Sequence, residues 1–284
     1  MTLRTHAATY IAERTNRGEL SRGSAMRVGY TLASFTASFG ARPLTQFGLR
    51  AVERWSGQHP EWRPSTRAVY LSTVRVFAAW MVRRKLVPGD ALAELRLPRR
   101  PPPAPRPMPR TDTSELLENV PDARARLIVQ LCYGAGLRCC GVDGLRVEDI
   151  DFVGRTMHVT EKGGHQRRLP LMPDIEHAIA DYLTEHPSTS GPLIRSYTRP
   201  WAPLSAQHVG SLVGRWMRSC GVKHAAGDGR GAHALRHTAL TETADACGDP
   251  WVLQELAGWA SISTAAFYVR RASTERVRAA LEAR

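Results

Sequence analysis

The amino-acid sequence predicts a mainly α-helical protein of two domains, with one small β-hairpin in the second. Three observations carry this prediction. The 284 residues exceed the roughly 100–200 residues of a usual single domain. A proline-rich stretch divides the chain near residue 100. On both sides of it apolar residues recur at helical spacing, and alternation of polar and apolar residues is confined to 155–171.

The dividing stretch is 96–110, R-L-P-R-R-P-P-P-A-P-R-P-M-P-R, which holds seven prolines, five arginines and no acidic residue. Proline fixes φ and has no amide hydrogen, so this stretch cannot form a helix interior or a central strand. We predict an extended, semi-rigid linker over 96–112. It separates a first domain at 1–95 from a second at 113–284.

Helices account for the whole first domain. Apolar residues three and four apart predict a helix over 24–39, and 44–55 is a shorter candidate. The next helix begins after Pro64, with Ser65 or Thr66 expected as its N-cap. Its apolar side is expected to consist of Val69, Val74, Phe77, Trp80 and Met81.

The second domain is mostly helical around one hairpin. It opens with predicted helices at 113–120 and 122–133. Two strands, 155–159 and 166–171, flank the Gly163-Gly164 pair, which suits a tight turn. Helical patterns then return in six segments: 174–185, 205–220, 233–246, 249–258, 264–269 and 273–281.

Positive charge is concentrated in the first domain and the linker. Of the net charge of +13, residues 1–95 contribute +8 and 96–110 contribute +5, whereas 111–284 is neutral. A basic domain joined to a neutral one suggests that the first binds a polyanion and the second acts on it. The alternative is a merely arginine-rich composition, since the chain has only three lysines.

Several classes of protein are disfavoured by the sequence. No apolar stretch approaches the ~18 residues of a membrane span, and the N-terminal residues lack the apolar core of a secretory signal. Neither a disulfide framework nor a zinc ribbon is indicated, because the cysteines are odd in number and form no C-x-x-C pair. We therefore expect a soluble cytoplasmic protein with reduced thiols: Cys132, Cys139, Cys140, Cys220 and Cys247.

Four separated segments share one chemical theme. They are Gly136-Leu137-Arg138, then Glu161-Lys162-Gly163-Gly164, then His233-Ala234-Leu235-Arg236-His237, then Leu256-Ala257-Gly258-Trp259 with Tyr268 nine residues further on. Each is weak alone. In this order the set resembles the tyrosine recombinase (phage integrase / Xer-like) family, across nearly the full length of the chain. The resemblance implies that the first domain is a four-helix, SAM-like core-DNA-binding domain and the second is the catalytic domain.

These residue types suit cleavage of a phosphodiester. Two guanidiniums, Arg138 and Arg236, can hold the non-bridging oxygens and offset the charge of the transition state. Tyr268 is the candidate nucleophile; a phenol with a reference pKa of about 10 needs a proton acceptor, for which His233 is the natural general base. No metal and no other cofactor is expected, because the arginines do the work of a metal ion.

The resemblance assigns further roles. Lys162 would protonate the departing 5′ oxygen, and Trp259 would hydrogen-bond the phosphate through its indole N–H. His237 matches a histidine that is structural in the family, so it is left out of the catalytic set. The family usually has an acidic residue where this chain has Gly141, and Asp143 faces elsewhere on a helix. We expect Arg138 to be oriented by another group or by water.

Candidate DNA-binding residues lie outside this set. Arg67 and Arg75 fall away from the apolar stripe of their helix, as phosphate-contacting residues would, although solvated surface explains them equally well. In the linker we expect Arg99, Arg100 and Arg106 to follow the DNA backbone.

The resemblance also implies an assembly. In it, the two domains hold double-stranded DNA in a C-shaped clamp, and four copies of the chain act as a homotetramer on two duplexes. Strands are exchanged through a 3′-phosphotyrosyl intermediate and a Holliday junction, and the protein acts at the nucleoid. Accessory directionality or host DNA-bending factors would be further partners. The segment 274–284 is expected to dock on a neighbouring protomer, with an intramolecular cap as the alternative.

Other functions remain open. The chain could be a DNA-binding protein without catalysis, a type IB topoisomerase or a telomere resolvase. Among recombinases, integrases that bind separate arm sites carry a further small domain before the core-binding one, and we expect none here because the core-binding helices start early in the sequence. That favours a simple integrase or a Xer-like resolvase of chromosome or plasmid dimers. Gly141 and the atypical linker favour an integrase that integrates or excises mobile or phage DNA.

Overall fold

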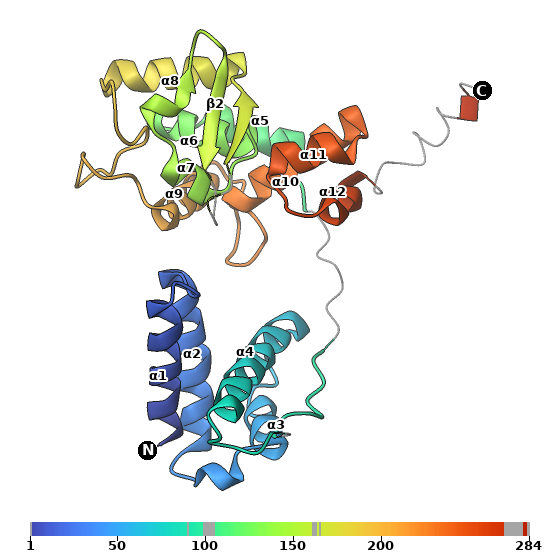
Figure 1. Ribbon diagram of the computed structural model, residues 1–284. Coiled ribbons are helices and arrows are strands. Elements are labelled where there is room, and N and C mark those ends of the chain that lie inside the picture. Colours follow the sequence, from blue (N-terminus) through green and yellow to red (C-terminus); the bar gives the residue numbers. More distant parts are fainter. Residues whose placement is uncertain are drawn as a thin grey trace. The chain divides into compact units, whose positions relative to one another are not determined.

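The computed structural model describes residues 2–89, 91–98, 106–160, 164, 166–269 and 281–282 (Figure 1). The chain divides into two compact units, Met1–Pro103 and Ala104–Arg284, and this division falls inside the stretch 96–112. The described residues are mainly helical with one small antiparallel sheet, which confirms the predicted fold class. None of their helices is both long and apolar enough to cross a membrane.

The described residues of the first unit form four α-helices. They are α1 (Leu3–Asn16), α2 (Arg22–Phe39), α3 (Leu49–Gly57) and α4 (Pro64–Arg83), with a short 3₁₀ turn at Leu44–Gln46. Helix α2 starts where Ser21 accepts a hydrogen bond from the amide of Ser24, two residues earlier than the start predicted from apolar spacing. Helices α1 and α2 lie side by side (Figure 1).

Helix α4 corrects two details of the sequence interpretation. Pro64 is itself the first helical residue, and Arg63 occupies the cap, so neither Ser65 nor Thr66 is the N-cap. Proline is favoured there because the first amide of a helix has no partner to lose. Val69 is 45% exposed and does not belong to the buried stripe, to which Ala68 and Leu71 contribute instead.

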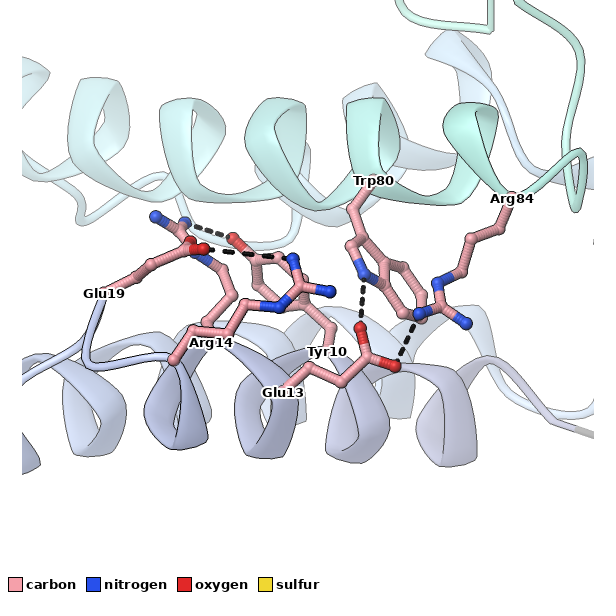
Figure 2. A network of polar contacts seen from close by, with 7 residues as sticks. Tyr10, Glu13, Arg14, Glu19, Trp80 and Arg84 are labelled. Carbon is pink, nitrogen blue, oxygen red and sulfur yellow. Dashed lines mark hydrogen bonds and ion pairs between the residues drawn. The ribbon is translucent and has the colours of Figure 1, made fainter.

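Helix α1 is tied to the C-terminal part of α4 by polar contacts (Figure 2). The Glu13 carboxylate accepts hydrogen bonds from the Trp80 indole at 3.1 Å and from Arg84 at 2.6 Å. The next residue, Arg14, makes local bonds: it donates to the Tyr10 hydroxyl one turn earlier in α1 at 2.8 Å and to Glu19 after the helix at 2.7 Å. These bonds stabilise a helix whose own apolar spacing is too weak to have been predicted individually.

The second unit combines helices with a small sheet. The sheet has the order β1 (Ile150–Asp151), β2 (Thr156–Thr160) and β3 (Gln166–Pro170), all antiparallel. The hairpin β2–β3 was predicted, whereas β1 was not. The helices are α5 (Arg110–Glu118), α6 (Ala123–Tyr133), α7 (Cys139–Gly144), α8 (Pro173–Glu185), α9 (Ala206–Ser219), α10 (Ala232–Cys247), α11 (Pro250–Ala257) and α12 (Ile262–Val269).

Two apolar clusters organise this unit. The larger one centres on α6, which packs against α8 and α10. The smaller one is formed by α10, α11 and α12 and includes Leu253, Ala257, Ala265 and Tyr268. Figure 1 shows these three helices grouped at one end of the unit. The predicted helix at 273–281 falls almost entirely outside the described residues.

The segment that enters the second unit is fastened near α10. The Met108 amide donates to Thr238 Oγ1 at 2.8 Å, Arg110 pairs with Glu242 at 3.3 Å, and Asp112 pairs with Arg230 at 2.8 Å. The position of α10 is therefore fixed by these polar contacts with the entering segment as well as by the apolar core.

Candidate active site

Helix α10 presents two candidate residues, His233 and Arg236, and the histidine that was set aside, His237, on one face. His233, Arg236 and His237 are three and four residues apart, and side chains at this spacing project from the same side of a helix. Arg236 is only 2% exposed. Its guanidinium donates to the carbonyl of Gly136 and, at 2.6 Å, to the carbonyl of Ala257.

Arg138 reaches the same carbonyl from another element. It is the residue before α7, and its Nη1 donates to Ala257 O at 3.3 Å. Gly136, two residues earlier, has φ of +60°, a conformation that favours glycine. The Gly-Leu-Arg motif therefore has a structural reason: the glycine turns the chain so that its own carbonyl contacts Arg236 while Arg138 enters the site.

The shared carbonyl belongs to the C-terminal end of α11. Gly258 ends this helix with φ of +62°, and the last carbonyls of a helix carry partial negative charge. The preceding carbonyl, that of Leu256, accepts a hydrogen bond from Arg167 of β3. Sequence reasoning missed Arg167, because a strand arginine at the edge of a turn has no distinguishing motif.

Positive charge is therefore crowded at this helix end. Burial, followed by the charges of Arg138 and Arg167, lowers the pKa of Arg236 to about 9. Burial and the Arg138 charge lower the pKa of Arg167 to about 10, and burial lowers the pKa of Arg138. All three remain mainly protonated at neutral pH, so the arrangement suits a bound anion such as a phosphate.

Tyr268 lies beside this charge in α12. It is 5% exposed, and burial raises its pKa to about 12, although Arg236 and Arg138 act in the opposite direction. Its hydroxyl contacts Nδ1 of His237. The phenol is therefore neutral at physiological pH and has a proton acceptor at hand.

His237 lies against Tyr268 in the structure, and His233 lies against His237. His237, which the sequence interpretation set aside as structural, stacks on Tyr268 with ring centres 5.8 Å apart. His233 lies edge-on to His237, with ring centres 4.4 Å apart. Burial and nearby positive charge lower both pKa values, that of His237 to about 4. The helical spacing from His233 was the signal that could have identified His237.

Trp259 completes the cluster. Its ring centre lies 5.1 Å from that of Tyr268 and 5.9 Å from Cζ of Arg236. Gln254 holds the turn, since it accepts the Trp259 amide at 3.2 Å and donates its side chain to the Trp259 carbonyl at 3.0 Å. The Leu-Ala-Gly-Trp motif is thus the C-terminal cap of α11.

Gly141 stands where an acidic residue is usual in the resembled family, and it hydrogen-bonds only through its backbone. Gly141 is buried in α7, and its amide donates to the Arg138 carbonyl at 2.8 Å. Asp143 accepts the amide of Ala206 at 3.1 Å and so caps the start of α9. The Ala257 carbonyl is one group that orients Arg138.

The predicted DNA-binding residues have different surroundings. Arg75 is exposed on α4, whereas Arg67 is half-buried and donates to the His59 carbonyl at 3.0 Å. Arg106 is exposed, and its side chain passes close to Gly229. Lys162, Arg99 and Arg100 lie outside the described residues.

Comparisons with known proteins agree on one family. The model of the phage integrase family matches residues 108–275. The tyrosine recombinase XerC of Neisseria meningitidis serogroup C (strain 053442) is 28% identical over 250 residues, which cover 85% of this chain and 75% of the relative.

Two solved structures have the same fold. A λ integrase (75–356) dimer bound to a COC′ core site has a TM-score of 0.76 at 17% identity, covering 93% of this chain and 97% of that one. A λ integrase tetramer bound to a Holliday junction has a TM-score of 0.77 at 16% identity, covering 94% and 77%.

Proposed function

Because the chain belongs to the phage integrase family of tyrosine recombinases, which transfer DNA strands, we propose that it cleaves and rejoins DNA at a specific site through Tyr268. One observation carries the assignment of the nucleophile. The hydroxyl of the buried Tyr268 contacts a histidine, in a cluster with Trp259, the buried Arg236 and the half-buried Arg138.

In the proposed first step, the Tyr268 oxygen attacks the scissile phosphorus and the bond to the 5′ oxygen breaks. Arg138 and Arg236 hold the non-bridging oxygens and offset the charge that develops on them. The indole N–H of Trp259 donates a further hydrogen bond to the phosphate. The product is a 3′-phosphotyrosyl bond, which a 5′-hydroxyl from a partner strand later attacks to reseal the DNA.

Two proton transfers accompany this step. The phenolic proton passes to the histidine pair: His233 is our candidate base, and His237 is in contact with the hydroxyl in this structure. A neutral imidazole can accept a proton, and the lowered pKa values favour the neutral form of both rings. We assign protonation of the departing 5′ oxygen to Lys162, in the connection between β2 and β3.

We propose double-stranded DNA as the partner and a homotetramer on two duplexes as the working assembly. The charge of +8 on residues 1–95 supports DNA binding by the first unit, and Arg75 is exposed for phosphate contact. A dimer and a tetramer of λ integrase on DNA share the fold of this chain, which supports the assembly.

Covalent capture tests the proposed chemistry. We would incubate the protein with a library of duplexes that have a randomised core and a nick near it, so that the cleaved 5′-hydroxyl fragment diffuses away. The expected result is a protein–DNA band that survives SDS, with Tyr268→Phe as the control that gives none. A wild-type protein that forms no covalent complex with any duplex would instead be a DNA-binding protein without catalysis.

The role of the recombinase has two candidates. Gly141, in place of the usual acid, and the proline-rich linker favour an integrase of phage or mobile DNA. The XerC relatives favour a resolvase of chromosome or plasmid dimers. An attachment-like repeat flanking the gene would support the integrase. Relaxation of supercoiled DNA without sequence preference would point instead to a topoisomerase-like enzyme.

A further inference from the structure

Three guanidiniums meet two successive carbonyls at the end of α11. Arg167 donates to Leu256 O, while Arg138 and Arg236 donate to Ala257 O at 3.3 and 2.6 Å. The three arginines come from β3, from the start of α7 and from α10. A single helical turn therefore connects three elements that are far apart in the sequence.

Arg167 is packed closely against the end of this turn. A Cβ atom at Gly258 would lie 3.4–3.5 Å from Cδ, Nη1 and Nε of Arg167, which is van der Waals contact distance. Residue 259, the next along the chain, is the tryptophan that contacts Tyr268. Arg167 also follows the β2–β3 connection that contains Lys162. It therefore joins the strand after that connection to the turn that presents Trp259.

The charge at the helix end strengthens this contact. Hydrogen bonds from a guanidinium to a carbonyl are charge-assisted, and the partial negative charge of a helix C-terminus favours them. Gly141 offers Arg138 no side-chain carboxylate, so the position of the Ala257 carbonyl matters more for the orientation of Arg138. Whatever fixes Leu256 also fixes the carbonyl one residue later.

We propose that Arg167 is a positioning residue for strand cleavage: by holding Leu256 against β3, it fixes the Ala257 carbonyl that orients Arg138 and Arg236 and the turn that presents Trp259. This inference rests on the proposed function. Arg167 acts through the turn, and the atoms that react belong to other residues.

The first test measures cleavage. Arg167→Ala, Arg167→Lys and a control, Arg168→Ala, would react with the nicked duplex captured by the wild type. Arg168 is the neighbouring strand residue; it is exposed and contacts Thr156 at 2.9 Å and Asp151 at 3.7 Å. At saturating DNA, Arg167→Ala should lower the rate of covalent complex formation about tenfold to a hundredfold, with DNA affinity within about threefold of wild type.

Rescue separates positioning from general damage to the fold. A lysine can still donate one charge-assisted hydrogen bond to Leu256 O, so Arg167→Lys should recover part of the rate that Arg167→Ala loses. Arg168→Ala removes the same charge one residue away and should stay within about threefold of wild type. Equal losses in Arg167→Ala and Arg168→Ala, or no loss in Arg167→Ala, would overturn the proposal.

The second test needs no DNA. The amides of Gly258 and Trp259 donate to Glu255 O and Gln254 O, both at 3.2 Å, and should be slow to exchange. Arg167→Ala should accelerate their hydrogen exchange, whereas Arg168→Ala should not. Unchanged exchange overturns the positioning role. If the wild type cleaves no duplex, the proposed function fails, and exchange alone then decides whether Arg167 holds the turn.

Discussion

Replacing His237 by asparagine should make the stability of the protein less dependent on pH. Burial, together with His233 and Arg236, lowers the pKa of His237 to about 4 from a reference value of 6.5. The folded state therefore binds fewer protons than the unfolded state below pH 6.5. Stability is lost as pH falls from about 6.5 towards 4, where the folded histidine also becomes protonated.

The size of the effect follows from these two pKa values. At pH 5.5 about nine-tenths of the unfolded histidine is protonated, against about 3% of the folded one. The resulting loss in the free energy of unfolding at pH 5.5 is at most about 1.4 kcal/mol, or about 1 kcal/mol after allowance for solvent near the half-buried ring. His237→Asn removes this contribution. Loss of the contact with Tyr268 lowers the free energy of unfolding equally at neutral and acidic pH, so it cancels when the two are compared.

Thermal unfolding at pH 7.5 and pH 5.5 measures this change. The drop in Tm between the two pH values should be smaller in His237→Asn than in wild type by about 2–4 °C. Tyr268→Phe is the matched control: it keeps the buried histidine and removes only the hydroxyl, so the wild-type drop should persist. An unchanged drop in His237→Asn would show that the folded protein does not hold this histidine neutral.

Three further substitutions test separate features. Gly258→Ala places a side chain at φ of +62° and against Arg167, so urea unfolding should show a loss of about 1–2 kcal/mol, with slower cleavage. Glu13→Ala removes the acceptor of Trp80 and should destabilise the first unit by about 1–2 kcal/mol in the same assay. Gly141→Glu should leave the cleavage rate unchanged or lower it; a tenfold gain would mean that the missing acid impairs this enzyme.

The structure brings together residues that the sequence proposed for the site, but the sequence did not indicate the residues that hold them in place. Arg138, Arg236, Trp259 and Tyr268 could be predicted because their motifs have fixed spacing, and the structure brings them together. Arg167 could not, because only the fold brings its side chain to the Leu256 carbonyl at the end of α11. His237 was visible in the sequence but was given a structural role, since only the fold shows which ring faces Tyr268.

The same contrast holds for the fold. Strong apolar spacing predicted the helix over 24–39, and alternation predicted the β2–β3 hairpin. Helix α1 was not predicted individually, since part of what holds it is long-range: Trp80 and Arg84 donate hydrogen bonds to Glu13, and no local pattern shows such bonds. Val69 was wrongly assigned to the apolar side of α4, where its neighbour Ala68 is buried instead. The small alanine side chain gives little apolar signal in the sequence, so the larger valine was chosen.

The electrostatics of the site imply that an anion stabilises the second unit. The lowered pKa values of Arg236 and Arg167 mean that burial and mutual repulsion penalise their charged forms. A phosphate beside them compensates for both penalties, so its binding raises these pKa values and its free energy adds to that of folding. The carbonyls at the end of α11 orient the guanidiniums but carry only partial charge. A carboxylate in their place would neutralise the arginines more completely, and it would also weaken their attraction for a bound phosphate.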